Sequence, residues 1–148
     1  MSFTVAEGVD LARRGEHPAQ VCRMKSGWLV LADMQYLSGY CILLADPVVG
    51  SLNELGERQR SDFLLDMAKA GDAIQQVTGA YRINYGIMGN SDPALHAHIA
   101  PRLFVEPEDM KHNHPWAYPP EVMFGRPFDA ERDAGLIRKL RAVLLEEK

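Results

Sequence analysis

Apolar residues gather in short runs along the first two thirds of the chain, each of the length expected for a strand. Residues 21–24, 28–33 and 39–44 form three such runs, and Lys25-Ser26-Gly27 between the first two is a turn signal. Residues 81–85 and 95–103 have the same character. The pattern predicts five strands, and the short loops between several of them favour a mainly antiparallel sheet.

Helical periodicity occurs in three places. A stripe of apolar residues at about 3.6-residue spacing predicts a long helix over 54–77, which Gly79 ends. Residues 4–14 predict a short helix that stops at Gly15, and residues 129–146 predict a final helix with Asp129 as its N-cap. Residues 106–127 are rich in proline, histidine and aromatics and have little periodicity. We therefore expect an α+β fold in one domain over 1–148, with a core over 3–105 and an extension over 106–148.

Composition narrows the class of protein. A chain of 148 residues with 47% hydrophobic and 24% charged residues can bury a real core as one globular domain. A net charge of −4 argues against a partner that is a nucleic acid. No apolar run approaches the roughly 18 residues of a membrane span, so we expect no membrane partner. The first residues lack the pattern of a signal peptide, and Cys22 and Cys41 lie in apolar runs, where buried thiols are expected. These features predict a cytoplasmic protein.

The most informative segment is 95–102, Leu-His-Ala-His-Ile-Ala-Pro-Arg. Side chains at positions i and i+2 of a strand point to the same face, so His96 and His98 should stand side by side, with Ala97 and Ile99 turned into the core. Neighbouring titratable side chains on a half-buried strand usually serve metal binding or phosphate chemistry.

This segment and the loop before it resemble the signature of the histidine triad superfamily of nucleotide hydrolases and transferases. In that signature three histidines alternate with apolar residues and Pro-Arg often follows. Pro101-Arg102 sets the register, so that His96 matches the middle histidine and Ala94 stands where the first would be. The upstream residues that match the family's loop are Asn84, Gly86, Gly89, Asn90 and Ser91.

The resemblance implies a histidine-triad-like α+β fold with a five-stranded sheet, one long helix and a C-terminal helix. It also implies that His96 is the nucleophile and that His98 donates to a phosphate oxygen. The other implied substrate contacts are Asp33 at the ribose and uncharged donors from Asn84, Asn90 and Ser91. The implied activity is cleavage at the α-phosphate of a dinucleoside polyphosphate or nucleoside phosphoramidate through a phosphohistidine. No cofactor is required, although a divalent cation can accompany the substrate, and family members commonly form homodimers.

Other interpretations of the same residues stay open. Without the first histidine, the chain could be a nucleotide-binding module with weak or no catalysis. The His-x-His pair could instead bind zinc in a hydrolase, with His112 and His114 completing the ligand set. Arg102 is either a salt-bridge partner or a phosphate clamp, and Trp116 is either a lid over the cavity or a dimer contact.

Overall fold

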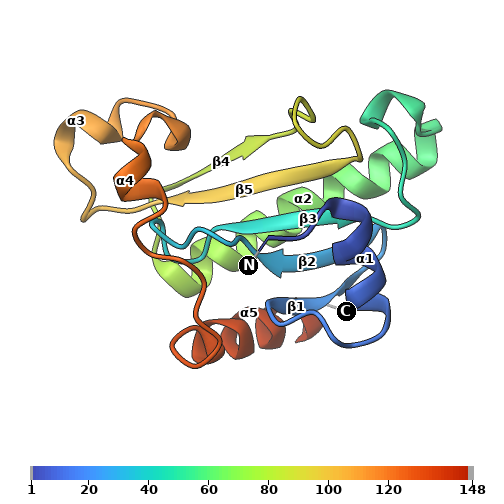
Figure 1. Cartoon of the computed structure of the whole chain (residues 1–148), viewed down its shortest axis with the longest axis horizontal. Helices are drawn as coiled ribbons and strands as arrows, with labels where there is room; N and C mark the ends of the chain where they lie inside the picture. The colour runs from blue at the N-terminus through green and yellow to red at the C-terminus, as the bar shows by residue number, and fades with distance from the viewer. Residues whose placement is uncertain (1, 147–148) are drawn as a thin grey trace.

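The computed structural model, which describes residues 2–146, contains one antiparallel five-stranded sheet in the order β1-β2-β3-β5-β4 (Figure 1). Each strand joins its neighbour in antiparallel register. The strands are β1 (Gln20–Met24), β2 (Gly27–Leu31), β3 (Cys41–Ala45), β4 (Arg82–Gly86) and β5 (His96–Arg102). Both the five strands and the antiparallel α+β fold predicted from the apolar runs are confirmed.

Helices cover the sheet unequally. The helices are α1 (Val5–Arg13), α2 (Glu57–Thr78), α3 (Glu108–Lys111), α4 (Pro120–Met123) and α5 (Ala134–Glu146), with 3-10 turns η1 (Leu52–Glu54) and η2 (Pro115–Ala117). The long α2 lies behind the sheet in Figure 1, and α5 runs beside β1. No helix within residues 2–146 is long and apolar enough to cross a membrane.

The face of the sheet toward α2 and α5 carries the main core. Alternate residues of the central strands, such as Leu29, Leu43 and Ile99, meet Phe63 and Ile74 of α2 there, and all five are almost fully buried. Both cysteines are buried on this side of the sheet as well. Each Å² of apolar surface removed from water stabilises the fold by about 25 cal/mol, so this layer is the main source of stability.

Among residues 2–146, the opposite face of the sheet is covered at its two ends. At one end, Val5 and Val9 of α1 pack on Val30 and Leu44. At the other end, the segment after β5 contributes Tyr118 to a second cluster with Tyr40 and neighbouring residues. In Figure 1 these two covers lie on opposite sides of the view, with the middle of β5 between them. The uncovered part of the face between them is called the gap here, and His96 and His98 of β5 lie in it.

Two predicted helix boundaries were wrong. The long helix begins at Glu57 rather than 54, because Leu52–Glu54 forms a separate 3-10 turn. The final helix begins at Ala134 rather than 129. Asp129 nonetheless accepts from the backbone N–H groups of Glu131 and Arg132, as a cap would, so its side chain closes a turn before the helix. The predicted stop of α2 is confirmed, since Gly79 adopts the left-handed φ of +73° that suits glycine.

Candidate active site

β5 places both histidines on the sparsely covered face of the sheet. His96 pairs with Leu44 and His98 with Ile42 on β3, while Gly86 of β4 lies opposite His98 on the other side. The intervening Ala97 and Ile99 are fully buried in the core beneath. The two imidazole rings are 5.1 Å apart between centroids and meet at 66°. The alternation of β5 therefore presents two adjacent imidazoles from a rigid strand.

His96 is oriented by the backbone of the residue two positions before it. Its Nδ1 lies 2.7 Å from the carbonyl oxygen of Ala94. A carbonyl can only accept, so Nδ1 carries a proton, and in the neutral form of the ring Nε2 is the nitrogen with the lone pair. An imidazole in this form can act as a nucleophile without first losing a proton.

His98 has a side-chain partner instead. Its Nδ1 lies 2.6 Å from the hydroxyl oxygen of Tyr40, which precedes β3. The indole Nε1–H of Trp116 donates to the same hydroxyl at 3.0 Å. The Trp116 ring also meets the His98 ring edge-on, with 5.8 Å between centroids. Tyr40 is fully buried, and it joins His98 to Trp116, which is 18 residues further along the chain.

Burial keeps these groups neutral. Burial, with a smaller contribution from the neighbouring His96, lowers the pKa of His98 to about 4. Burial likewise raises the pKa of Tyr40 to about 12, although the hydrogen bond from Trp116 opposes the rise. At neutral pH His98 is an uncharged imidazole and Tyr40 keeps its proton.

Two clefts meet at His96. One, of about 170 Å³, lies between α1 and the sheet, and Phe3, His17, Asp33 and Asp92 are among its lining residues. The other, of about 260 Å³, runs between η1 and the loop before β5, where Gly50, Asn53 and Gly89 are among the lining residues. A substrate with two halves joined at a central phosphorus could occupy both clefts with that phosphorus at His96.

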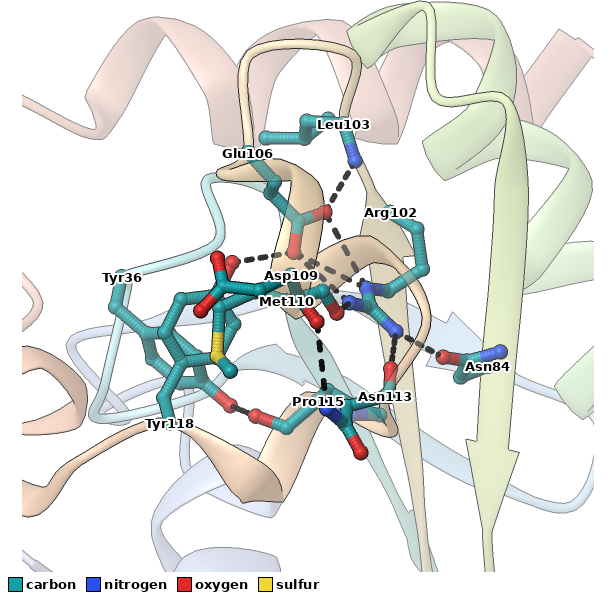
Figure 2. A network of polar contacts seen from close by, with 10 residues as sticks. All are labelled: Tyr36, Asn84, Arg102, Leu103, Glu106, Asp109, Met110, Asn113, Pro115 and Tyr118. Carbon is teal, nitrogen blue, oxygen red and sulfur yellow. Dashed lines mark hydrogen bonds and ion pairs between the residues drawn. The ribbon is translucent and has the colours of Figure 1, made fainter.

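The segment that carries Trp116 is anchored by an ion pair that is almost fully buried. Nη2 of Arg102 lies 3.0 Å from Oε1 of Glu106, and only 3% and 4% of the two side chains are exposed. Figure 2 shows the guanidinium of Arg102 also donating to Asn84 Oδ1 and to the carbonyls of Met110 and Asn113. Glu106 accepts in addition from Tyr118 and from the N–H of Leu103. Burial alone would raise the pKa of Glu106, but these hydrogen bonds hold it below its ordinary value.

Comparison with known proteins finds similarity in structure alone. No protein-family model matches the sequence, and the curated proteins give no match either. Among solved structures, a histidine triad protein from Sinorhizobium meliloti superposes with a TM-score of 0.70 at 17% identity, over 90% of this chain and 92% of that one. The chain has the histidine triad fold.

Two further solved structures with this fold are similar to the chain. A hypothetical histidine triad nucleotide-binding protein from Sulfolobus tokodaii matches with a TM-score of 0.70 at 14% identity, covering 93% of this chain and 91% of that one. A Zn-bound histidine triad family protein from Mycobacterium smegmatis matches with a TM-score of 0.59 at 18% identity, covering 96% of each chain. At these identities the likeness concerns the fold.

Within this histidine triad fold, the structure brings together some of the predicted site residues. Asp33 lines the same cleft as His96, on the α1 side. Asn84 instead accepts from Arg102 and lies in the separate cleft beyond Trp116. Asn90 and Ser91 are exposed on the loop before β5, whose Met88, Gly89 and Pro93 line the second cleft. The roles of all six predicted residues in binding and catalysis stay predictions.

Some contacts at the site were not predicted from the sequence. Tyr40 was not singled out, and Trp116 was predicted only as a lid or a dimer contact. Both meet His98 through tertiary packing, so no local pattern connects them. His17 lies between α1 and β1, where it lines the α1 cleft, and its Nδ1 accepts from the N–H of Ala19. Asp92 accepts from the N–H groups of Val5 and Ala94 and so joins α1 to the start of the histidine strand. The Asp-Pro turn at this position was the one local signal for such a contact.

The zinc interpretation lacks a ligand set. Across residues 2–146, no three or more His, Cys, Asp or Glu side chains come together as a group that could hold a metal. His112 and His114 are exposed on the extension, where they line the cleft along β4 with Asn84. Arg102 is bonded to Glu106, as expected of a structural salt bridge, and Trp116 packs over His98 within its own chain.

Proposed function

We propose that the chain is a nucleotide hydrolase or nucleotidyl transferase that acts at the α-phosphate of a dinucleoside polyphosphate or a nucleoside phosphoramidate. The observation that carries the proposal is the hydrogen bond from His96 to the Ala94 carbonyl, which leaves Nε2 as a lone-pair donor where two clefts meet. The histidine triad fold and the nucleotide-binding description of one structural neighbour support the substrate class.

The proposed chemistry has two steps. Nε2 of His96 attacks the α-phosphorus, a P–N bond forms, and the bond from phosphorus to the leaving group breaks. The leaving group departs with its electron pair and takes a proton from solvent. Water then attacks the phosphorus of the phosphohistidine and gives up a proton to solvent. The P–N bond breaks, its electron pair returns to Nε2 of His96, and the nucleoside monophosphate leaves. His98 stabilises the charge on a non-bridging oxygen.

The two clefts suggest how the substrate lies. The cleft beside α1 would take the nucleoside, with Asp33 at the ribose and apolar residues around the base. The cleft beside η1 would take the second group. The covalent step needs no metal, and a divalent cation would enter only with a polyphosphate.

The first prediction concerns the nucleophile. His96→Ala should lower turnover by several orders of magnitude while the fold survives, because loss of a covalent nucleophile removes most of the rate enhancement. The protein is incubated with a panel of adenylated and guanylated compounds, with and without a metal chelator, and products are identified by mass spectrometry. A nucleotidyl adduct on the peptide that contains His96 is expected in the wild type and absent in the variant.

His112→Ala is the matched control, because His112 is an exposed imidazole on the extension. It should leave both turnover and adduct unchanged. Turnover of His96→Ala within a few-fold of wild type would contradict the assignment of His96 as the nucleophile. Nucleotide binding without any adduct would favour the binding module with little catalysis that Ala94 suggests. Bound zinc in the purified protein, with activity that the chelator abolishes, would favour the zinc hydrolase.

A further inference from the structure

We propose that Tyr40, held by Trp116, is a positioning residue that keeps the proton of His98 on Nε2. The inference rests on the hydrogen bonds around one buried hydroxyl group. Its consequence for catalysis rests on the proposed function, but the position of the proton does not.

The direction of each hydrogen bond follows from what the three groups can do. An indole N–H can only donate, so Trp116 fixes the Tyr40 oxygen as an acceptor on one side. The proton of a phenol lies near the ring plane on one side or the other. With one side occupied by the indole, the Tyr40 proton points to the other acceptor at hand, Nδ1 of His98 at 2.6 Å. His98 therefore accepts at Nδ1 and carries its proton on Nε2.

The reverse arrangement leaves a buried donor without a partner. If Nδ1 of His98 carried the proton and donated to Tyr40, the hydroxyl proton would need another acceptor. Among the hydrogen bonds of residues 2–146, the Tyr40 hydroxyl has only His98 and Trp116 as partners. An unsatisfied donor in a fully buried side chain is costly, so this arrangement is disfavoured. Burial also lowers the pKa of His98 to about 4, which excludes a doubly protonated ring at neutral pH.

The result is a pair of neighbouring histidines with opposite tautomers. His96 carries its proton on Nδ1 because its partner is a carbonyl, and its Nε2 offers a lone pair. His98 carries its proton on Nε2, so Nε2 of His98 is a hydrogen-bond donor whereas Nε2 of His96 is not. A nucleophile and an oxygen donor thus stand side by side on one strand, without any change of charge.

Trp116 is itself placed by contacts outside the sheet. Its ring lies so close to Gly86 that a Cβ there would come within 2.8 Å of the indole. The Tyr36 hydroxyl donates to the carbonyl of Pro115 at 2.6 Å, which fixes the residue before Trp116. The extension therefore sets the tautomer of a histidine in the sheet, through Trp116 and then Tyr40.

The test is nitrogen NMR of the full-length protein with labelled histidines at neutral pH. The signals of His98 are assigned by their loss in His98→Gln. In the wild type, Nδ1 of His98 should resonate as an unprotonated nitrogen that accepts a hydrogen bond, and Nε2 as a protonated one. His96 should show the reverse. A proton with one-bond coupling to Nδ1 of His98 would overturn the proposal.

Two variants separate positioning from simple packing. Tyr40→Phe keeps the buried ring, and the Nδ1 signal of His98 should move toward that of a nitrogen without a hydrogen bond. Trp116→Phe frees one side of the Tyr40 hydroxyl, so a population with the proton on Nδ1 should appear. The control is Tyr85→Phe, which makes the same change on the α2 side of the sheet and should leave His98 unchanged. Unchanged His98 signals in both Tyr40→Phe and Trp116→Phe would refute the positioning role of Tyr40. If Tyr40→Phe does not fold, the spectra of Trp116→Phe and of the wild type still test that role.

Turnover gives a second readout. In Trp116→Phe, kcat should fall by roughly tenfold to a hundredfold, less than the loss of a whole oxygen donor, while KM stays within about twofold. The spectra need no substrate, so the two proposals fail separately. A wild type without turnover but with the expected tautomers contradicts the proposed function alone, whereas turnover with the proton on Nδ1 of His98 contradicts this inference alone.

Discussion

At the scale of single residues, the site depends on the atom to which each imidazole is bonded. The partner of His96 is a backbone carbonyl, which any residue at position 94 would supply. The partner of His98 is a side-chain hydroxyl, which only certain residues at position 40 can supply. Substitutions at the two positions should therefore have unequal effects on the histidines that they orient.

Restoring a histidine at position 94 tests this difference. If the carbonyl suffices to orient His96, Ala94→His should change the rate of adduct formation by about tenfold or less, equivalent to roughly 1.4 kcal/mol. The Ala94 side chain packs against the cluster of Val5 and Val9, so Ala94→Gln serves as a control for crowding. Single-turnover formation of nucleotidylated His96 measures the effect. No adduct in the wild type, with a clear one in Ala94→His, would contradict the hydrolase and favour the binding module.

Acid should destabilise the fold partly through His98. Its pKa is lowered from 6.5 to about 4 in the folded protein, so between these values the unfolded chain binds more protons. The free energy of unfolding should therefore fall as pH is lowered from 6.5 to 4, and more gently in His98→Gln than in the wild type. Urea denaturation at a series of pH values measures both slopes. The exposed His112→Gln should follow the wild type, and parallel curves for His98→Gln and wild type would contradict the prediction.

At the scale of elements, the strands and the long and final helices could be predicted from the sequence, and the structure of residues 106–127 could not. Strands such as β3 and β5 are local patterns of alternate burial, and the apolar stripe of α2 has its own period. The segment after β5 has short turns instead, whose positions depend on the buried pair of Arg102 and Glu106. Because Trp116 belongs to this segment, its approach to His98 could not be predicted from any local pattern.

The buried pair of Arg102 and Glu106 should dominate the stability of the segment that follows β5, residues 103–118. Glu106→Gln leaves the charge of Arg102 buried without its carboxylate, and removing one partner of such a pair typically costs about 3 kcal/mol or more. Glu108→Gln is the control, because Glu108 is 80% exposed beside Lys111 and such pairs contribute about 1 kcal/mol at most. Urea unfolding gives both differences. Equal losses in the two variants would show that the Arg102 network does not hold the segment.

At the scale of the whole molecule, the two edges of the sheet are treated differently. On β1, Arg141 of α5 donates to the carbonyls of Val21 and Gln20, so a helix satisfies part of that edge. On β4, the edge strand carries the exposed residues Arg82 and Tyr85 beside an open cleft of about 440 Å³. An uncovered edge is a template for pairing with another strand.

We therefore expect two copies of the chain to associate through β4 as a symmetric dimer. Light scattering over a wide range of concentration should give twice the mass of the 16.6 kDa chain. Tyr85→Lys adds a like charge to the same edge of both copies and should shift the mass toward the monomer. Arg138→Glu, an exchange of charge on α5, should not. A monomer mass for the wild type at all concentrations would reject the expectation.

The contact between Trp116 and His98 also gives the protein an optical label of its own. The chain has two tryptophans. The other, Trp28 on β2, donates its indole N–H to Asp46, which follows β3. The indole of Trp116 lies against an imidazole that would meet a bound phosphate, so its fluorescence would depend on what occupies the gap. Replacing Trp28 with phenylalanine would leave one emitter, at the gap itself. Ligands could then be ranked by titration in solution, without a chromogenic substrate and before the reaction is known.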